Sequence, residues 1–415
     1  MISERIRELA KKCEEELAPE FAKYEAVAAA NTERVLETFR ELQLAERHFN
    51  PTTGYGYNDD GREFADAAYA KLFEQESGFV RHSIVSGTHA LGIGLFALLR
   101  PGDTMLSITG KPYDTLDGVI GIGDAKEDGC LAEFGVKYKQ IDLVDGKTFD
   151  HDKIYTTLRT DKSIKVVYIQ RSKGYLNRES FAEIDITKMY LRVKSIVPDV
   201  FVVVDNCYGE FCDKREPMGD LVIGSLIKNP GGGIAESGAY IVGTKRAVDL
   251  AAARLTVPGI GLECGATLGQ TKNIIKGLFF APHTVCQALK TAAFASKLFD
   301  ALGYEVNPKP GDDRKDIIQT ISMSDAEGVC AFCRGLQKGS PVDSFVTPEP
   351  WDMPGYTSQV IMAAGAFTQG SSLELSADAP IRPPYTVFMQ GGLTYESGKY
   401  GVMLAAEECE KQKLQ

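Results

Sequence analysis

A series of short apolar, β-branched runs that alternate with helical stretches constrains the fold of this chain more than any other feature. Near-continuous apolar strands separated by helices are typical of a mostly parallel sheet that is covered on both faces. The sequence therefore predicts an α/β domain between about residues 80 and 275. Its expected strands lie in the runs DTMLSI, VKYKQIDL, IKVVYIQRS, VFVVVDN and GAYIVGT.

The segments on either side of this region have different patterns. Residues 1 to about 45 repeat apolar and charged groups at helical spacing, which predicts two or three amphipathic helices, and the turn-rich arm NPTTGYGYNDDGRE follows. After about residue 275 a helical stretch precedes the strand-like runs DIIQTISM and QVIMAAGAF. Since 415 residues exceed what one compact core usually holds, we predict three parts. These are N-terminal helices and an arm over 1–60, a large α/β domain over 61–280, and a smaller C-terminal α+β domain over 281–415.

The acidic composition restricts the possible partners. The 46 Lys and Arg residues against 57 Asp and Glu residues give a formal net charge of -11, whereas nucleic acids and anionic membranes are bound through basic surfaces. We therefore predict neither kind of partner. The opening MISERIRELAKKCEEEL has no apolar signal segment, and no run reaches the ~18 apolar residues of a membrane span, so a cytoplasmic protein is expected.

The cysteines and histidines do not predict a metal site. Nine cysteines at irregular spacing favour reduced thiols over a disulfide framework. Cys330 and Cys333 form a C-x-x-C pair, but a structural zinc site needs four ligands, and no second pair lies near them in the sequence. The five histidines lack a metal-binding spacing, so we predict no metal.

Two charged residues stand where apolar segments end. Asp205 ends the run VFVVVD, and a residue at the carboxyl end of such a strand lies at the crevice where open α/β sheets bind ligands. A helix cap or a turn would explain the same aspartate. Lys228 follows the apolar segment LVIGSLI, where burial would lower the pKa of its amine and make it a nucleophile. A surface lysine before a turn is the alternative.

A third candidate lies in the sequence SIVSGTHALGIGLFALL. Its first apolar run ends at Ser86 and an apolar helical pattern follows at once, so the N–H groups of Gly87, Thr88 and His89 are expected at a helix N-terminus. Such groups bind anions, and a phosphate fits there. Helix capping alone would explain the hydroxyl residues, but not their combination with an acid and a lysine elsewhere.

Nucleotide-binding motifs are weak in this chain. Gly92, Gly94 and Ala97 match part of a dinucleotide-binding fingerprint, but they lie inside a helical apolar pattern and not at a strand-to-helix turn. We interpret them as positions of close helix packing. No G-x-x-x-x-G-K-[ST] sequence is present, so a nucleoside triphosphate site is not predicted.

An anion site, an acid at a strand end and a lysine after an apolar segment together match what pyridoxal 5'-phosphate requires of a protein. Lys228 would form the Schiff base, Asp205 would keep the pyridine nitrogen protonated, and the helix N-terminus would bind the phosphate. Ser225, three residues before the lysine, is expected to add a hydroxyl to the phosphate site. Tyr113, in GKPYDTL, is placed to stack on the cofactor ring.

The stretches SGTHA, VVVDNCYGEF and SLIKNPGGG resemble the pyridoxal-phosphate enzymes of cysteine and methionine metabolism. Over nearly its full length the chain is similar to the methionine gamma-lyase-like proteins that are often labelled as aluminium-resistance proteins. The resemblance implies the aspartate-aminotransferase fold of type I, with a mostly parallel sheet of the seven-stranded type in the large domain.

The resemblance also assigns roles to individual residues. It implies Lys228 as the Schiff-base lysine, Asp205 as the partner of the pyridine nitrogen and Tyr113 as the stacking ring. A tyrosine-rich arm from a neighbouring subunit would complete the phosphate site, which implies a homo-oligomer, a dimer-based tetramer with shared active sites. The implied phosphate ligands and their surroundings are Ser86, Gly87, Thr88, His89 and Ser225, with Tyr55, Tyr57 and Arg62 in the arm.

The function that the resemblance implies is a carbon–sulfur lyase, which acts on cystathionine, cysteine or methionine by β- or γ-elimination. A threonine-type aldolase, an aminotransferase, or a regulatory protein that holds the cofactor without turnover would use the same cofactor site, so these alternatives stay open. An amino-acid substrate also needs a cation for its α-carboxylate. Arg382, in ADAPIRPPYTVF, is our candidate, and a surface arginine in a proline-rich loop is the alternative.

Overall fold

The apolar runs form the predicted mostly parallel sheet. In the computed structural model, which describes residues 2–55, 59–123, 128–176, 178–353 and 358–414, seven strands stand in the order β1-β7-β6-β5-β4-β2-β3. Strand β7 runs antiparallel to its neighbours β1 and β6, and the other neighbouring strands are parallel. The strands are β1 (Ser77–Arg81), β2 (Thr104–Ser107), β3 (Lys137–Gln140), β4 (Ile164–Gln170), β5 (Phe201–Asp205), β6 (Leu221–Ser225) and β7 (Ala239–Gly243).

Helices cover both faces of this sheet, which is why the residues of β6 and β7 are buried throughout. One face packs against α3, α4 and α7, and the other against α2, α5, α6 and part of α8 (Thr271–Ala301). At Gly94 in α3 a Cβ atom would lie 2.7 Å from Cδ1 of Ile223, so the glycine permits the close helix packing that the sequence predicts. The helices are α2 (Asp60–Leu72), α3 (Gly87–Leu98), α4 (Leu116–Ile120), α5 (His151–Thr160), α6 (Glu183–Ile196) and α7 (Lys245–Leu255).

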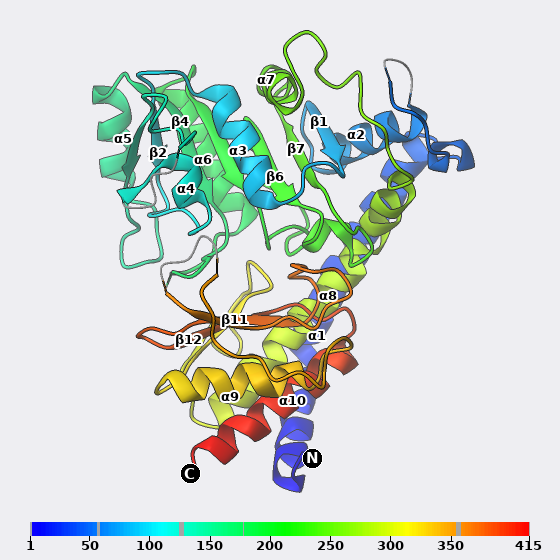
Figure 1. Cartoon of the computed structure of the whole chain (residues 1–415), viewed down its shortest axis with the longest axis vertical. Coiled ribbons are helices and arrows are strands. Elements are labelled where there is room, and N and C mark those ends of the chain that lie inside the picture. The colour runs from blue at the N-terminus through cyan, green and yellow to red at the C-terminus, as the bar shows by residue number, and fades with distance from the viewer. Residues whose placement is uncertain (1, 56–58, 124–127, 177, 354–357, 415) are drawn as a thin grey trace.

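The N-terminal region differs from the expectation of two or three helices. It is one continuous helix, α1 (Glu4–Glu41), followed by the short 3-10 helix η1 (Glu46–Phe49), and Pro19 lies inside α1 without ending it. A proline removes one backbone donor, but packing of an apolar face supplies most of the stability of a helix in a protein. Here α1 packs along α8 (Thr271–Ala301), as Figure 1 shows, so the helix continues.

Helices α1 and α8 pass through both halves of the molecule. The first half of α1 and the last turns of α8 belong to the C-terminal core, whereas Val35 and Phe39 of α1 and the earlier turns of α8 belong to the core of the large sheet. The division that the sequence suggests at residue 280 therefore falls inside α8. The two cores therefore share these helices.

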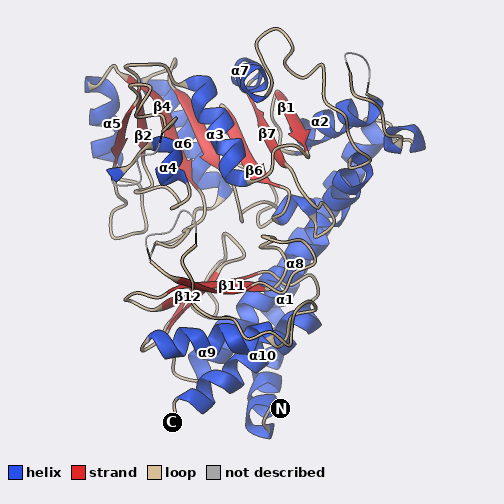
Figure 2. Ribbon diagram, viewed as in Figure 1, coloured by secondary structure: helices blue, strands red, loops and turns tan. Residues whose placement is uncertain are grey.

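The C-terminal region is an antiparallel five-stranded sheet, in the order β10-β11-β12-β9-β8, that packs against α9 and α10 (Figure 2). Cys330 and Cys333 lie on α9 and are buried in this apolar core. The elements are β8 (Val306–Asn307), β9 (Gln319–Ser322), α9 (Ala326–Gln337), β10 (Val360–Ala363), β11 (Ser376–Pro380), β12 (Thr386–Gln390) and α10 (Tyr395–Gln412).

The carboxyl ends of β4, β5 and β6 face the C-terminal sheet. Gln170, Asp205 and Ser225 are the last residues of these strands, and all three line a cavity whose opposite wall includes residues of β11 and β12. Ligands of open α/β sheets bind at this edge. Among the helices that the structure describes, none is both long and apolar enough to cross a lipid bilayer.

Candidate active site

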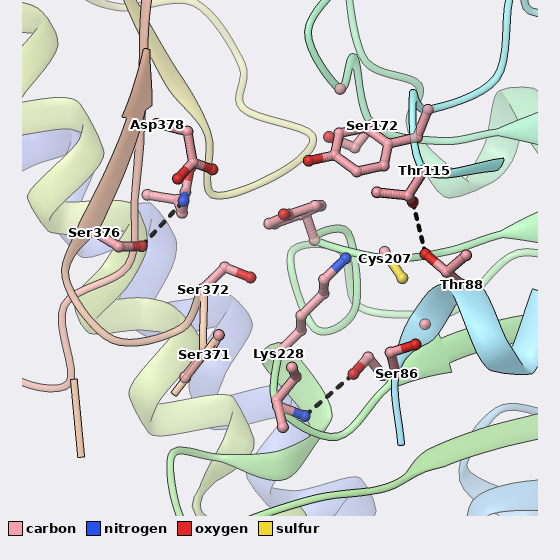
Figure 3. A pocket seen from close by; sticks show the side chains of 18 of the residues that line it. Ser86, Thr88, Thr115, Ser172, Cys207, Lys228, Ser371, Ser372, Ser376 and Asp378 are labelled. Atoms are coloured by element: carbon pink, nitrogen blue, oxygen red, sulfur yellow. Dashed lines mark hydrogen bonds between the residues drawn. The ribbon is translucent and has the colours of Figure 1, made fainter. Parts of the chain in front are cut away.

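The cavity at the carboxyl edge has a volume of about 550 Å³ and brings together residues from both halves of the chain. Figure 3 shows part of it: Lys228 points into the open space, Ser86, Thr88 and Cys207 lie on the large-sheet side, and Asp378 lies on the C-terminal side. The predicted residues that line the cavity are Ser86, Gly87, Thr88, Tyr113, Asp205, Ser225 and Lys228. They come from separate segments of the sequence, so the fold, not local sequence, assembles them.

Lys228 is held at the turn that follows β6. Its backbone N–H donates to the carbonyl of Ser225 at 3.3 Å, and the Ser225 hydroxyl accepts from the N–H of Ile227 at 3.3 Å. The short 3-10 helix η3 (Asn229–Gly231) begins at the next residue. These contacts fix the backbone, so the lysine side chain leaves the sheet edge in one direction.

The glycines after Lys228 permit direct contact between the backbones of the turn and α8. Gly232 has φ +60°, and a Cβ atom on it would lie 2.2 Å from the carbonyl oxygen of Gly277. A Cβ atom on Gly277 would lie 2.3 Å from the carbonyl oxygen of Gly231. Because no side chain fits at these positions, the segment that carries the lysine is packed directly on α8.

The amine of Lys228 lies over the ring of Tyr208, with Nζ 4.1 Å from the ring centroid. Burial acts to lower the pKa of this amine, but the acidic groups around it, which include the carboxylate of Asp205, act in the opposite direction and raise the pKa above its ordinary value. Without a ligand the amine is therefore protonated. It must lose a proton before it can attack a carbonyl carbon.

Asp205 ends β5 with both carboxylate oxygens positioned. The Tyr168 hydroxyl donates to Oδ2 at 3.1 Å, and the N–H of Cys207 donates to Oδ1 at 3.1 Å. The residue is only 6% exposed and lines the cavity. The contact with the N–H of Cys207 is of the kind expected for an aspartate that only forms a turn. The carboxylate also lines the cavity, however, so it is available to a ligand.

Helix α3 begins at Gly87 beside the lysine. Ser86 is its N-cap, with the hydroxyl accepting from the N–H of His89 at 3.1 Å, so that donor is already used within the chain. The first N–H groups of a helix have no partner inside the helix, and here they belong to Gly87 and Thr88. The Thr88 hydroxyl lies 2.6 Å from that of Thr115, which orients it at the cavity wall.

Tyr113 is positioned at the cavity wall by Gln170. The side-chain oxygen of Gln170 accepts from the N–H of Tyr113 at 2.7 Å, and the Tyr113 ring lies 5.4 Å from the ring of Tyr175. A Cβ atom on Gly174 would lie 3.0 Å from the Tyr113 ring, so a glycine there leaves room for it. The ring is thus packed and borders the cavity.

Other predicted residues lie elsewhere. His89 borders a second cavity, of about 870 Å³, next to the first. Tyr55 is 85% exposed, and Tyr57 lies outside the described residues. Arg62 is buried and donates to the carbonyl of Gly265 at 3.1 Å within its own chain. Arg382 borders a separate cavity, of about 210 Å³, with its guanidinium 3.8 Å from the carboxylate of Asp114.

Several cavity residues are not predicted from the sequence. On the large-sheet side these are Cys207 and Tyr208, which follow Asp205 directly, and burial raises the pKa of both side chains, with the charge of Asp205 adding to the effect on the thiol. On the C-terminal side the wall contains the hydroxyl, amide and carboxyl side chains of Ser371, Ser372, Ser376, Asp378 and Gln390. The alternation of polar and small apolar residues in SADA is the one signal that could have indicated this wall.

A buried polar cluster supports the loop after Asp205. The guanidinium of Arg171, which is 0% exposed, donates to Asn206 at 2.8 Å and lies 3.3 Å from Glu216 and 2.6 Å from Asp213. Nearby, burial and the charge of Glu216 raise the pKa of Glu210 to about 8. We name Arg171, Asn206, Glu210, Asp213, Glu216 and Tyr240 the buried polar cluster. It connects the loop to the strands behind the cavity.

Comparison with known proteins places this chain in a family. A family model described as methionine gamma-lyase matches residues 6–410. The chain belongs to the methionine gamma-lyase family. Its relatives include the uncharacterized protein YnbB of Bacillus subtilis (strain 168), which is 44% identical over 414 residues, 99% of this chain and 98% of YnbB.

Solved structures of similar proteins share this architecture. A carbon-sulfur lyase involved in aluminum resistance from Clostridium novyi NT is 48% identical, with a TM-score of 0.93 over 98% of this chain and 96% of that one. A more distant likeness is to the pyridoxal-5'-phosphate dependent protein YhfS from Escherichia coli, at 12% identity and a TM-score of 0.59 over 93% of this chain and 96% of that one. The predicted type I fold of pyridoxal-phosphate enzymes is thereby confirmed.

Proposed function

We propose that this protein is a pyridoxal-phosphate-dependent carbon–sulfur lyase that acts on a sulfur amino acid by β- or γ-elimination. The observation that carries the proposal is the convergence of the Lys228 amine, the Asp205 carboxylate and the N-terminus of α3 on one cavity. The similarity to the carbon-sulfur lyase from Clostridium novyi NT supports the same class of reaction.

The cavity fits the proposed cofactor at the position where the phosphate would bind. A Cβ atom on Gly87 would lie 3.3 Å from Sγ of Cys207 and 3.9 Å from Nζ of Lys228, so a side chain there would occupy the space beside the amine. A glycine at the start of α3 instead leaves its N–H open to an anion. The hydroxyls of Thr88 and Ser225 border the same space and would add phosphate ligands.

The other roles follow from the chemistry of each side chain. Asp205 would hold the pyridine nitrogen in its protonated form, and the Tyr113 ring would cover a face of the cofactor. When bound, the cofactor supplies an electron sink for the charge that develops at the substrate Cα atom. The Lys228 amine, once unprotonated, would remove the Cα proton and later return a proton to the product. Packing of the C-terminal wall over the cavity would keep water from the reacting atoms.

A substrate survey tests the proposed function. The cofactor-loaded protein is incubated separately with cystathionine, cysteine, methionine and threonine, and pyruvate, 2-oxobutyrate, thiol and aldehyde are measured. We expect a keto acid and a thiol in equal amounts from at least one sulfur amino acid. Glycine and acetaldehyde from threonine, with no keto acid from the sulfur substrates, would indicate an aldolase instead. A cofactor spectrum that no amino acid changes would indicate a protein that holds the cofactor without turnover.

Asp205→Asn tests the role of the carboxylate at the pyridine nitrogen. The amide keeps an oxygen for one of the two donors but loses the negative charge, so we expect kcat for elimination to fall about a hundredfold or more while the fold is kept. The matched control is Tyr168→Phe, which removes the 3.1 Å hydrogen bond to Asp205 but leaves its charge, and we expect a loss below about tenfold. Equal losses in the two variants would contradict the role.

We also propose that the active unit is a dimer-based tetramer with shared sites. Tyr55 is 85% exposed and lies outside the lining of both cavities, as expected for a residue that acts on a neighbouring subunit. The second cavity shares Ser86, Thr88 and Thr115 with the first, which offers a place for such an arm next to the phosphate position. Arg382 stays our prediction for the substrate carboxylate, and its guanidinium would have to move out of its own cavity to take this role.

A further inference from the structure

Among the described residues, the C-terminal wall of the active-site cavity contains one carboxylate, that of Asp378 on β11. Side chains alternate along a strand, and here Ala377 and Ala379 face the apolar core while Ser376 and Asp378 face the cavity. In the sheet Asp378 stands between Met362 of β10 and Phe388 of β12. The strand therefore directs a charged group at the substrate space, and small residues fill the core side.

One oxygen of the Asp378 carboxylate is available to a ligand. Its Oδ1 atom is buried and has no hydrogen-bond partner among the described residues. Burial raises the pKa of Asp378 to about 6, although the nearby polar groups of Tyr175 and Gln390 and the charge of Lys228 act to lower it. The group is thus ionised at pH 8, and a buried carboxylate oxygen without a donor is costly unless a ligand supplies one.

Asp378 is the charged residue of the described cavity lining that has no role in cofactor binding. The charged residues among those that line it are Asp205, Lys228 and Asp378. The first two are assigned to the cofactor in the proposed function. Figure 3 shows Asp378 on the opposite side of the open space from Cys207 and Thr88, and therefore away from the large-sheet side that the proposed function assigns to the cofactor.

We propose that Asp378 is a specificity-determining residue that binds an ammonium group at the end of the substrate side chain. This inference rests on the proposed function and names its substrate class: sulfur amino acids whose leaving thiol carries an amine. The ammonium would donate to Oδ1 of Asp378, with the hydroxyls of Ser372 and Ser376 nearby on the same wall. A neutral side chain of the same size would leave that oxygen without a donor.

Two probes differ only in this group. S-(2-aminoethyl)cysteine ends in an ammonium and S-propylcysteine ends in a methyl of similar size. In each β-elimination the Cβ–S bond breaks, the sulfur takes a proton, and one water is consumed as the amine leaves. The products are therefore one thiol, one pyruvate and one ammonium ion per substrate, which are measured at pH 8.

For the wild-type holoenzyme we expect kcat/KM for the aminoethyl probe to exceed that for the propyl probe by about tenfold to a hundredfold. In Asp378→Asn this ratio should fall to about one, whereas Asp378→Glu, which keeps the charge, should retain a preference. Asp378→Ser provides the same test if the asparagine variant does not fold. The control is Glu396→Gln, which removes an exposed carboxylate in the first turn of α10, outside the lining of the cavity, and should keep the wild-type ratio. A ratio that is equal in wild type and Asp378→Asn would overturn the inference.

A measurement of ligand binding can test the specificity role of Asp378 independently of the lyase reaction. Trp351 is the one tryptophan of the sequence and lines the same cavity, so its fluorescence reports ligand binding in the holoenzyme. If the wild type converts neither probe but binds the aminoethyl probe at least about tenfold more tightly, and this preference is lost in Asp378→Asn, the specificity role stands and β-elimination of these substrates is excluded. If both probes are converted at equal rates, the lyase proposal stands and the specificity role falls.

Discussion

Lys228→Ala is expected to abolish the visible absorption band of the cofactor-loaded protein and to lower the rate of elimination by about 10²- to 10⁴-fold or more. The reason is that the amine over the Tyr208 ring has two roles in the proposed function, as the covalent attachment point and as the base. The measurement is the visible spectrum before and after borohydride, together with the rate on the best sulfur substrate. Digestion of the reduced wild type should place the cofactor mass on the peptide that contains Lys228.

A lysine on the surface provides the control for this experiment. Lys245 has a side chain that is 66% exposed and pairs with Asp249, so Lys245→Ala should keep both the band and the rate. Circular dichroism of the two variants shows whether each is folded. A folded Lys228→Ala protein with an unchanged band would mean that another amine holds the cofactor, and the site would have to be reassigned.

Arg171→Met is expected to lower the free energy of unfolding by about 3–5 kcal/mol, because it leaves the buried carboxylates around it without their cation. Glu216 is 3.3 Å from the guanidinium with a side chain only 1% exposed, and burial already raises the pKa of Glu216. Arg171 also donates to Asn206, the residue after Asp205, so we expect weaker cofactor binding as well. Urea denaturation measures the first effect and cofactor titration the second.

A double variant and a surface control make this prediction specific. Adding Glu216→Gln to Arg171→Met removes the uncompensated charge and should recover part of the lost stability. Arg47 forms an ion pair with Asp60 in which both side chains are exposed. Arg47→Met should therefore lower the free energy of unfolding by less than about 1 kcal/mol. A loss below about 1 kcal/mol in Arg171→Met itself would show that the buried polar cluster does not stabilise the fold.

Local sequence patterns predicted where the elements on the large-sheet side of the cavity begin and end. Asp205 and Lys228 follow apolar runs, and the start of α3 follows a capping serine, so each could be placed at the end of an element without knowledge of the rest. Parallel strands then bring their carboxyl ends to one edge, which is why separate predictions met in one cavity. The alternation of strands and helices likewise predicted the sheet.

Contacts between distant segments could not be predicted in this way. Asp378 is 150 positions after Lys228, and its place opposite the lysine depends on how the C-terminal sheet packs on the large one. The continuity of α1 through Pro19 depends on its packing along α8. The prolines around Arg382 indicate a fixed backbone, but they do not indicate its direction. The turn after β11 places Arg382 at a neighbouring cavity.

Because α8 passes through both cores, its orientation determines how the two walls of the cavity are aligned. This helix contacts the lysine-bearing turn at Gly277 and continues for several turns into the core beneath the Asp378 wall. At 31 residues it is about 46 Å long, so a tilt of only about 3° around its middle would displace its ends by about 1 Å. A displacement of about 1 Å between reacting groups can cost about a hundredfold in rate. Substitutions along the contact between α1 and α8 can therefore lower the rate of the reaction, although they lie far from any ligand. They would do so by misaligning the two walls of the cavity.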